Sequence, residues 1–155
     1  MSTVRSDSTR EQRVTVPALL RRKAKGERIT MLTAYDFSFA QIFDQAGIDL
    51  LLVGDSLGNV CQGAETTLPV TLDEVLYHTR CVARGASRAL VVSDMPFGSY
   101  QVSSEDALKN AIRLVKEAGA QAVKLAGGVT MRDTISRIVA AETPGRRHAG
   151  LTPEA

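Results

Sequence analysis

The sequence predicts an α/β fold in which parallel strands alternate with helices. Residues 48–53 form an apolar run without alternation, which is typical of a strand that is buried on both faces. Three glycines, Gly47, Gly85 and Gly119, each end a helical pattern and stand shortly before an apolar run. They follow one another at steps of 38 and 34 residues, so a module of one helix and one strand repeats along the chain.

The composition indicates a single soluble domain. With 155 residues, 44% hydrophobic and 23% charged, the chain is large enough for one core and too short for two. The net charge is only +2 and the basic residues are scattered, so we expect no nucleic-acid partner. No run of about 18 apolar residues is present to span a membrane. Cys61 and Cys81 lack the paired spacing of a zinc site, so we expect free thiols and a reducing, cytoplasmic location.

The first predicted module follows a polar segment, residues 1–16, that we interpret as a disordered arm without the apolar region of a secretory signal. Pro17 at a first helical position predicts a short helix that stops at Gly26. Residues 28–34 then predict a strand of modest length. The helix after it ends at Gly47 and carries apolar residues at helical spacing, namely Phe39, Ile42 and Phe43.

The later modules carry clearer helix signals. Thr71 and Glu74 form a capping-box pair at the start of a helix that runs to Gly85. The remaining predicted elements are a strand over residues 89–93, a helix from Ser103 or Ser104 to Gly119, a strand over residues 121–125 and a helix over about residues 131–141.

Four strands that alternate with helices make about half of a (β/α)8 barrel. A complete barrel takes about 250 residues, which is well above the 155 present. We therefore divide the chain into a disordered arm, residues 1–16, a truncated barrel domain, residues 17–141, and an irregular tail, residues 142–155. An open half barrel leaves two sheet edges without a neighbouring strand, and such edges invite pairing with another chain.

Polar side chains stand where the predicted strands end. Asp55 and Ser56 follow the strand over residues 48–53, and Asp94 follows the next strand. Ligands of parallel α/β folds bind at the carboxyl ends of the strands, and carboxylates beside hydroxyls suit Mg²⁺. Lys124 lies near the end of the fourth strand, where an ammonium group needs a partner.

Each of these residues also has a purely structural interpretation. An aspartate at a strand end is a common helix cap or turn former, and Ser56 could satisfy the loop backbone. Lys124 could form a salt bridge with a neighbouring carboxylate. His78 is expected at the edge of the core or in solvent, and His148 lies in the tail. Spacing alone leaves both interpretations open.

Five stretches of the sequence match one known family in order and with near-family spacing. They are MLTAYDFSFAQIFDQAGID, LLVGDSLGNVCQGAETTLPVTLDE, HTRCVARGA, SDMPFGSY and AVKLAGG. On these residues the chain resembles the ketopantoate hydroxymethyltransferase family over about residues 28–128. The resemblance resumes more faintly at Pro144, His148 and GLTP.

The resemblance implies a metal-dependent (β/α)8 barrel that assembles into a large homo-oligomer. It also implies transfer of a hydroxymethyl group from 5,10-methylenetetrahydrofolate to the 2-oxo acid 3-methyl-2-oxobutanoate, a step of pantothenate biosynthesis. Carried over by motif position, Asp55 of VGDS and Asp94 of SDMPF would hold Mg²⁺ and contact the substrate. Ser56 would contact the substrate carboxylate, and Lys124 of VKLAGG would be the catalytic residue that stabilises the developing oxyanion. His148 would match a histidine of the family's active site.

The sequence departs from the family pattern in three places. Ala126 stands where the family motif has an acidic residue, which leaves two carboxylates for the metal. The family's general base is a glutamate of the barrel half that is not matched here, and TPGRRHAG replaces an apolar fifth strand. The chain is therefore either a transferase of this family or a catalytically inactive remnant or interaction subunit of it. A lyase or mutase of a related phosphoenolpyruvate-type barrel would need a phosphate or carboxylate clamp that the sequence does not reveal.

Overall fold

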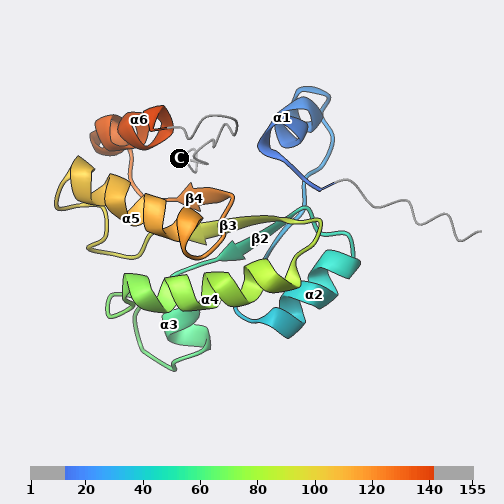
Figure 1. Ribbon diagram of the computed structural model, residues 1–155, viewed down its shortest axis with the longest axis horizontal. Helices are drawn as coiled ribbons and strands as arrows, with labels where there is room; N and C mark the ends of the chain where they lie inside the picture. Colours follow the sequence, from blue (N-terminus) through green and yellow to red (C-terminus); the bar gives the residue numbers. More distant parts are fainter. Residues whose placement is uncertain (1–12, 142–155) are drawn as a thin grey trace, which may run out of the picture.

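A four-stranded parallel sheet forms the centre of the computed structural model, which describes residues 13–141 (Figure 1). The strands lie in chain order, and each pairs in parallel with the next. Their bounds are β1 Met31–Thr33, β2 Leu50–Val53, β3 Leu90–Asp94 and β4 Ala122–Lys124. The predicted alternation of helices and parallel strands is confirmed, although β1 and β4 are shorter than the predicted strands over residues 28–34 and 121–125.

One helix precedes β1, and the other helices follow the strands. In chain order, the helical elements are α1 Val16–Ala24, α2 Phe37–Gln45, α3 Leu57–Val60, α4 Leu72–Gly85, α5 Ser104–Lys116, the 3-10 turn η1 Val129–Met131 and α6 Arg132–Ala140. The predicted capping box is present, because the Glu74 N–H donates to Thr71 Oγ1 and the Thr71 N–H donates to the Glu74 carboxylate. Ser103 caps α5 in the same way through the N–H of Asp106.

The two faces of the sheet bury two separate cores. Because side chains alternate along a strand, Leu51 and Val91 point to one face while Leu50 and Leu90 point to the other. The first face packs against α2, α4 and α5, and the second packs against α1 through Leu19. Figure 1 shows α1 on the side of the sheet opposite α2 and α4.

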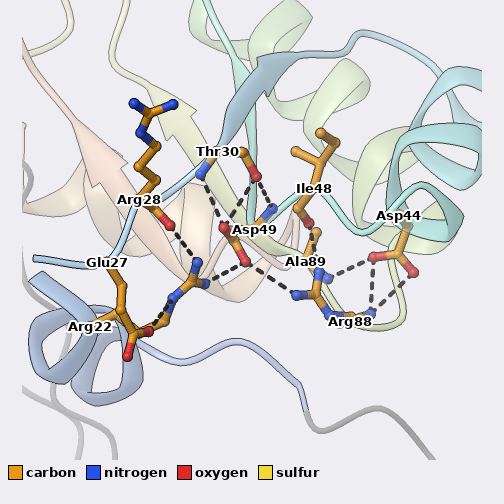
Figure 2. Close-up of polar contacts among 9 residues, drawn as sticks. All are labelled: Arg22, Glu27, Arg28, Thr30, Asp44, Ile48, Asp49, Arg88 and Ala89. Atoms are coloured by element: carbon orange, nitrogen blue, oxygen red, sulfur yellow. Dashed lines mark hydrogen bonds and ion pairs between the residues drawn. The ribbon is translucent and has the colours of Figure 1, made fainter. Parts of the chain in front are cut away.

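A buried carboxylate at the amino end of β2 ties α1 to this second face (Figure 2). Asp49 is 3% exposed and accepts hydrogen bonds from Arg22 at 2.6 Å and Arg88 at 3.1 Å. The N–H and hydroxyl of Thr30 both donate to its second oxygen. Burial alone would raise the pKa of Asp49, but the bonds from Arg22 and Thr30 outweigh it and lower this pKa to about 2.

The first core is closest packed where α2 crosses α4. A Cβ added to Gly85, the last residue of α4, would lie 2.6 Å from the carbonyl oxygen of Phe37 and 2.9 Å from Cβ of Ala40. Gly85 ends its helix as predicted, but its lack of a side chain serves this crossing as well. Ala40 therefore faces the core, while Phe39 and Ile42 of the predicted apolar stripe are each 56% exposed.

The predicted arm, residues 1–16, is described only in part, and the predicted tail, residues 142–155, is not described. Residues 1–12 and 142–155 lie outside the described residues. Within the predicted arm, Val14 is 7% exposed, donates its N–H to the carbonyl of Arg88 and belongs to the second core. Thr15 caps α1, which begins one residue before Pro17. Residues 57–69, between β2 and α4, contain the short helix α3.

Candidate active site at the carboxyl ends of the strands

Two of the predicted site residues pair across the carboxyl ends of β3 and β4. Asp94 and Lys124 are register partners in neighbouring parallel strands. The Lys124 ammonium donates to Asp94 Oδ2 at 2.7 Å, and the Asp94 side chain is only 8% exposed. The structure thus contains the salt bridge to a neighbouring carboxylate that the structural interpretation of Lys124 predicts. This salt bridge also lies at the carboxyl ends of the strands, where a functional role of Lys124 requires its ammonium group.

The pair projects from the sheet face opposite α2, α4 and α5. Val92 and Ala122, two residues before Asp94 and Lys124, belong to the core on the α1 side. Alternation along each strand places Asp94 and Lys124 on that same face. In a closed barrel this face is the interior, so the ion pair stands where the barrel opens to its substrate.

Asp55 and Ser56 follow β2 at the same rim, and the lack of a side chain at Gly54 lets their neighbours approach closely. A Cβ added to Gly54 would lie 2.9 Å from Ser56 Oγ and 4.0 Å from Asp94 Oδ2. A hydroxyl from the β2 end and a carboxylate from β3 therefore lie close together beside Gly54. Asp55 and Ser56 are both half-buried.

Burial is the main influence on the charge of Asp94. It raises the pKa of Asp94, and the negative charge of Asp55 acts in the same direction, while the hydrogen bond and charge of Lys124 oppose both. The coupling to Asp55 shows that the two carboxylates share one electrostatic environment, as the strand-end positions predicted.

Two further side chains, Tyr100 and Tyr35, lie beside the site, although spacing alone does not assign them to it. Tyr100 is 6% exposed, and burial and the charge of Asp94 raise the pKa of its phenol. Tyr35 Oη lies 2.7 Å from Ser56 Oγ. The hydroxyls of Thr79 and Ser93, 2.9 Å apart, lie instead in the core on the opposite face of the sheet, which α4 covers. Tyr35 and Tyr100 stand in the motifs quoted above, but spacing gave no signal of what they touch.

The remaining residues that the sequence analysis discusses are His78, Ala126 and His148. His78 donates from Nδ1 to the carbonyl oxygen of Tyr35 at 2.7 Å, because a carbonyl can only accept, so it has the core-edge position that was expected. Ala126 is exposed beyond the end of β4. His148 lies outside the described residues.

The residues at the rim fit a magnesium ion. Mg²⁺ is commonly bound through one or two carboxylates together with substrate and water, and Asp55 and Asp94 supply two carboxylates at this rim. Residues 13–141 contain no cluster of three or more His, Cys, Asp or Glu side chains that could enclose a metal. An ion here would therefore need further ligands, from substrate and water, in addition to these two carboxylates.

Comparison with known proteins decides the family. The family model of ketopantoate hydroxymethyltransferase matches residues 13–155. The chain belongs to the ketopantoate hydroxymethyltransferase family. It is 55% identical over 145 residues to the 3-methyl-2-oxobutanoate hydroxymethyltransferase of Janthinobacterium sp. (strain Marseille), covering 94% of this chain and 53% of that protein. It is 57% identical over 142 residues to the protein of the same name from Clostridium botulinum (strain Kyoto / Type A2), covering 92% and 52%.

The chain thus spans about half the length of the curated ketopantoate hydroxymethyltransferases that it matches. Solved structures show the same proportion. A phosphonopyruvate hydrolase solved with oxalate and Mg²⁺ superposes with a TM-score of 0.69 at 16% identity, covering 89% of this chain and 52% of that one. For a 2,3-dimethylmalate lyase of the PEP mutase/isocitrate lyase superfamily the TM-score is 0.65 at 16% identity, with 88% and 52% covered. These structures confirm the predicted fold, about half of a (β/α)8 barrel.

Within residues 13–141, the structure contains no helix that is both long enough and apolar enough to cross a membrane.

Proposed function

We propose that the whole protein transfers a hydroxymethyl group from 5,10-methylenetetrahydrofolate to 3-methyl-2-oxobutanoate. The observation that carries this proposal is the joint placement of Asp55, Asp94 and Lys124 at one rim, in a chain of the ketopantoate hydroxymethyltransferase family. The 2-oxo acid and the folate are its proposed small-molecule partners, and a homo-oligomer is its proposed assembly, both implied by the family resemblance.

Each rim residue has a proposed role that its surroundings support. Asp55 and Asp94 would hold Mg²⁺, which when bound draws charge from the 2-oxo group and acidifies the neighbouring C3–H of the substrate. Lys124 would place its ammonium beside the oxygen that becomes negative, because Asp94 fixes this ammonium at 2.7 Å. Ser56 would donate its hydroxyl to the substrate carboxylate from the end of β2, where its Oγ lies beside Gly54 and on the side of Asp94.

Exchange of the C3 hydrogen of 3-methyl-2-oxobutanoate with deuterium tests this proposal without the folate. We expect the full chain with Mg²⁺ to exchange this hydrogen faster than solvent alone, as followed by proton NMR of the two methyl groups. Asp55→Asn keeps the side-chain shape and removes the charge, and we expect it to slow exchange by about a hundredfold or to background.

Glu117→Gln is the matched control, because Glu117 caps the end of α5 that leads to the amino end of β4 and pairs only with Arg113 in the described chain. Exchange at the solvent rate by the folded wild-type chain would reject the proposal for this polypeptide.

A second candidate is a polypeptide that is inactive without the rest of a barrel. One observation that favours this candidate is that the rim has two carboxylates, and the described chain offers no third acidic ligand there. Another is that the chain covers only 53% of the matched relative from Janthinobacterium. Background exchange together with intact binding of the 2-oxo acid is the outcome that this candidate predicts.

A further inference from the structure

Tyr35, which follows β1, contacts Ser56, a predicted substrate-binding residue that follows β2. Tyr35 Oη and Ser56 Oγ lie 2.7 Å apart, across 21 residues of sequence. Ser56 stands where the strand has ended and before the short helix α3, and its own hydroxyl makes no capping bond to that helix. Within the described chain, Tyr35 is thus the hydroxyl partner that restrains the Ser56 side chain.

Tyr35 is itself held from two sides. Its carbonyl oxygen accepts the bond from His78 Nδ1 at 2.7 Å, and the two rings meet edge to face with centroids 6.3 Å apart. The preceding residue, Ala34, donates its N–H to the carbonyl of Leu52 and so continues the pairing of β1 with β2. The phenol is therefore fixed in position by α4 and by the sheet.

The chemistry of the two hydroxyls gives their bond a direction when an anion is near. A phenol is more acidic than an alcohol and is the better donor, whereas both hydroxyls can accept. With Tyr35 donating to Ser56 Oγ, the Ser56 proton is free to point away from Tyr35. Donation into Ser56 Oγ also polarises its O–H bond, since hydrogen bonds in a chain strengthen one another.

We propose that Tyr35 is a positioning residue that orients the Ser56 hydroxyl toward the carboxylate of a bound 2-oxo acid. This inference rests on the proposed function, because it assigns the anion that Ser56 meets. Tyr35 does not touch the substrate in this scheme. Its effect passes entirely through Ser56, and so it should vanish when Ser56 has no hydroxyl.

A double-mutant cycle measures that dependence. The full chain and its Tyr35→Phe, Ser56→Ala and doubly substituted variants are titrated with 3-methyl-2-oxobutanoate in the presence of Mg²⁺ by calorimetry. We expect Ser56→Ala to weaken binding by about 10- to 100-fold, as for loss of a hydrogen bond to a charged group, and Tyr35→Phe by about 2- to 10-fold. The double variant should bind as Ser56→Ala does, within about twofold.

Tyr77→Phe is the matched control. Tyr77 is 59% exposed on α4 and meets the same His78 ring edge to face, with centroids 5.3 Å apart. Its substitution removes a phenolic hydroxyl that is not hydrogen-bonded to Ser56, so we expect unchanged affinity. Should Tyr35→Phe not fold, replacement of Tyr35 by 3-fluorotyrosine keeps the ring and the hydroxyl and makes the phenol a stronger donor. The affinity of this modified chain for 3-methyl-2-oxobutanoate should then differ at least about twofold from that of the unmodified chain. The difference should be absent when Ser56 is replaced by alanine.

The possible outcomes separate the two claims. Losses of affinity that multiply in the double variant would show that Tyr35 acts independently of Ser56 and would overturn the positioning role while leaving the proposed function intact. Absence of 2-oxo acid binding by the folded wild-type chain would overturn the proposed function and the positioning role together.

Discussion

At the scale of single residues, the rim residues lie at the carboxyl ends of the strands, and Asp49 lies at the amino end of β2. The partners of Asp49 are 19, 27 and 39 residues away in the chain, and only the fold brings them together. One of them, Arg22, reaches Asp49 because α1 packs against the sheet. The sequence therefore gives no signal for Asp49, whereas Asp55, Ser56, Asp94 and Lys124 stand out as polar residues at the ends of buried strands.

The charge of Asp49 predicts how stability depends on pH. The pKa of Asp49 is about 2 in the folded chain and 3.8 in its ordinary state, so ionised Asp49 stabilises the fold by about 2 kcal/mol. This stabilisation is fully present above about pH 4 and is lost as the pH falls toward 2. We expect Asp49→Asn to lower the free energy of unfolding in urea by about 2 kcal/mol at pH 7 and by much less near pH 2.

Asp73→Asn provides the comparison for that measurement. Asp73 pairs with Arg113 at 2.8 Å but its side chain is 79% exposed, so water screens the pair. We expect a change within about 0.5 kcal/mol. Equal losses for the two variants, or a loss for Asp49→Asn that persists unchanged at low pH, would show that the Asp49 network does not have the assigned strength.

At the scale of elements, start and stop signals were reliable and the buried face of one helix was not. The capping box at Thr71 and the end of α4 at Gly85 are where the sequence predicted them. In α2 the apolar stripe predicts that Phe39 and Ile42 face the core, but both are 56% exposed, and Ala40 is the side chain that meets α4 at Gly85. Which face of a helix is buried depends on the closest approach of its neighbour, and the helix's own sequence does not contain that information.

The crossing of α2 and α4 makes a glycine essential within a helix. Alanine is favoured over glycine in helices by about 1 kcal/mol. At Gly85, however, the added Cβ would lie 2.6 Å from the Phe37 carbonyl oxygen, so the helices must separate. We expect Gly85→Ala to lower the thermal midpoint and to cost about 1–3 kcal/mol.

Gly128→Ala tests the same change where there is room. Nothing lies within 4 Å of a Cβ added to Gly128, and its φ of −94° is outside the left-handed region. Its unfolding midpoint should therefore fall less than that of Gly85→Ala. A Gly85→Ala variant as stable as Gly128→Ala would contradict the packing described for α2 and α4.

At the scale of the whole molecule, the sheet has a closed side and an open side. Three helices cover one face, while α1 and the rim residues Asp94 and Lys124 occupy the other, which a complete barrel encloses. Within residues 13–141, β1 and β4 each pair with one strand only. The repeated glycines and the strand count predicted this half barrel. They could not predict α1 as its cover, because the short basic helix carries only one strongly buried side chain, Leu19.

The central claim is that Asp55 and Asp94 together bind Mg²⁺ for a 2-oxo acid, and calorimetric titration with 3-methyl-2-oxobutanoate tests it most directly. We expect the wild-type chain to bind at least about tenfold more tightly with Mg²⁺ than without it. In Asp55→Asn and in Asp94→Asn that difference should disappear, because each removes one of two carboxylates at the rim. Affinity that is independent of Mg²⁺ in the wild-type chain, or equally Mg²⁺-dependent in both variants, would contradict the account.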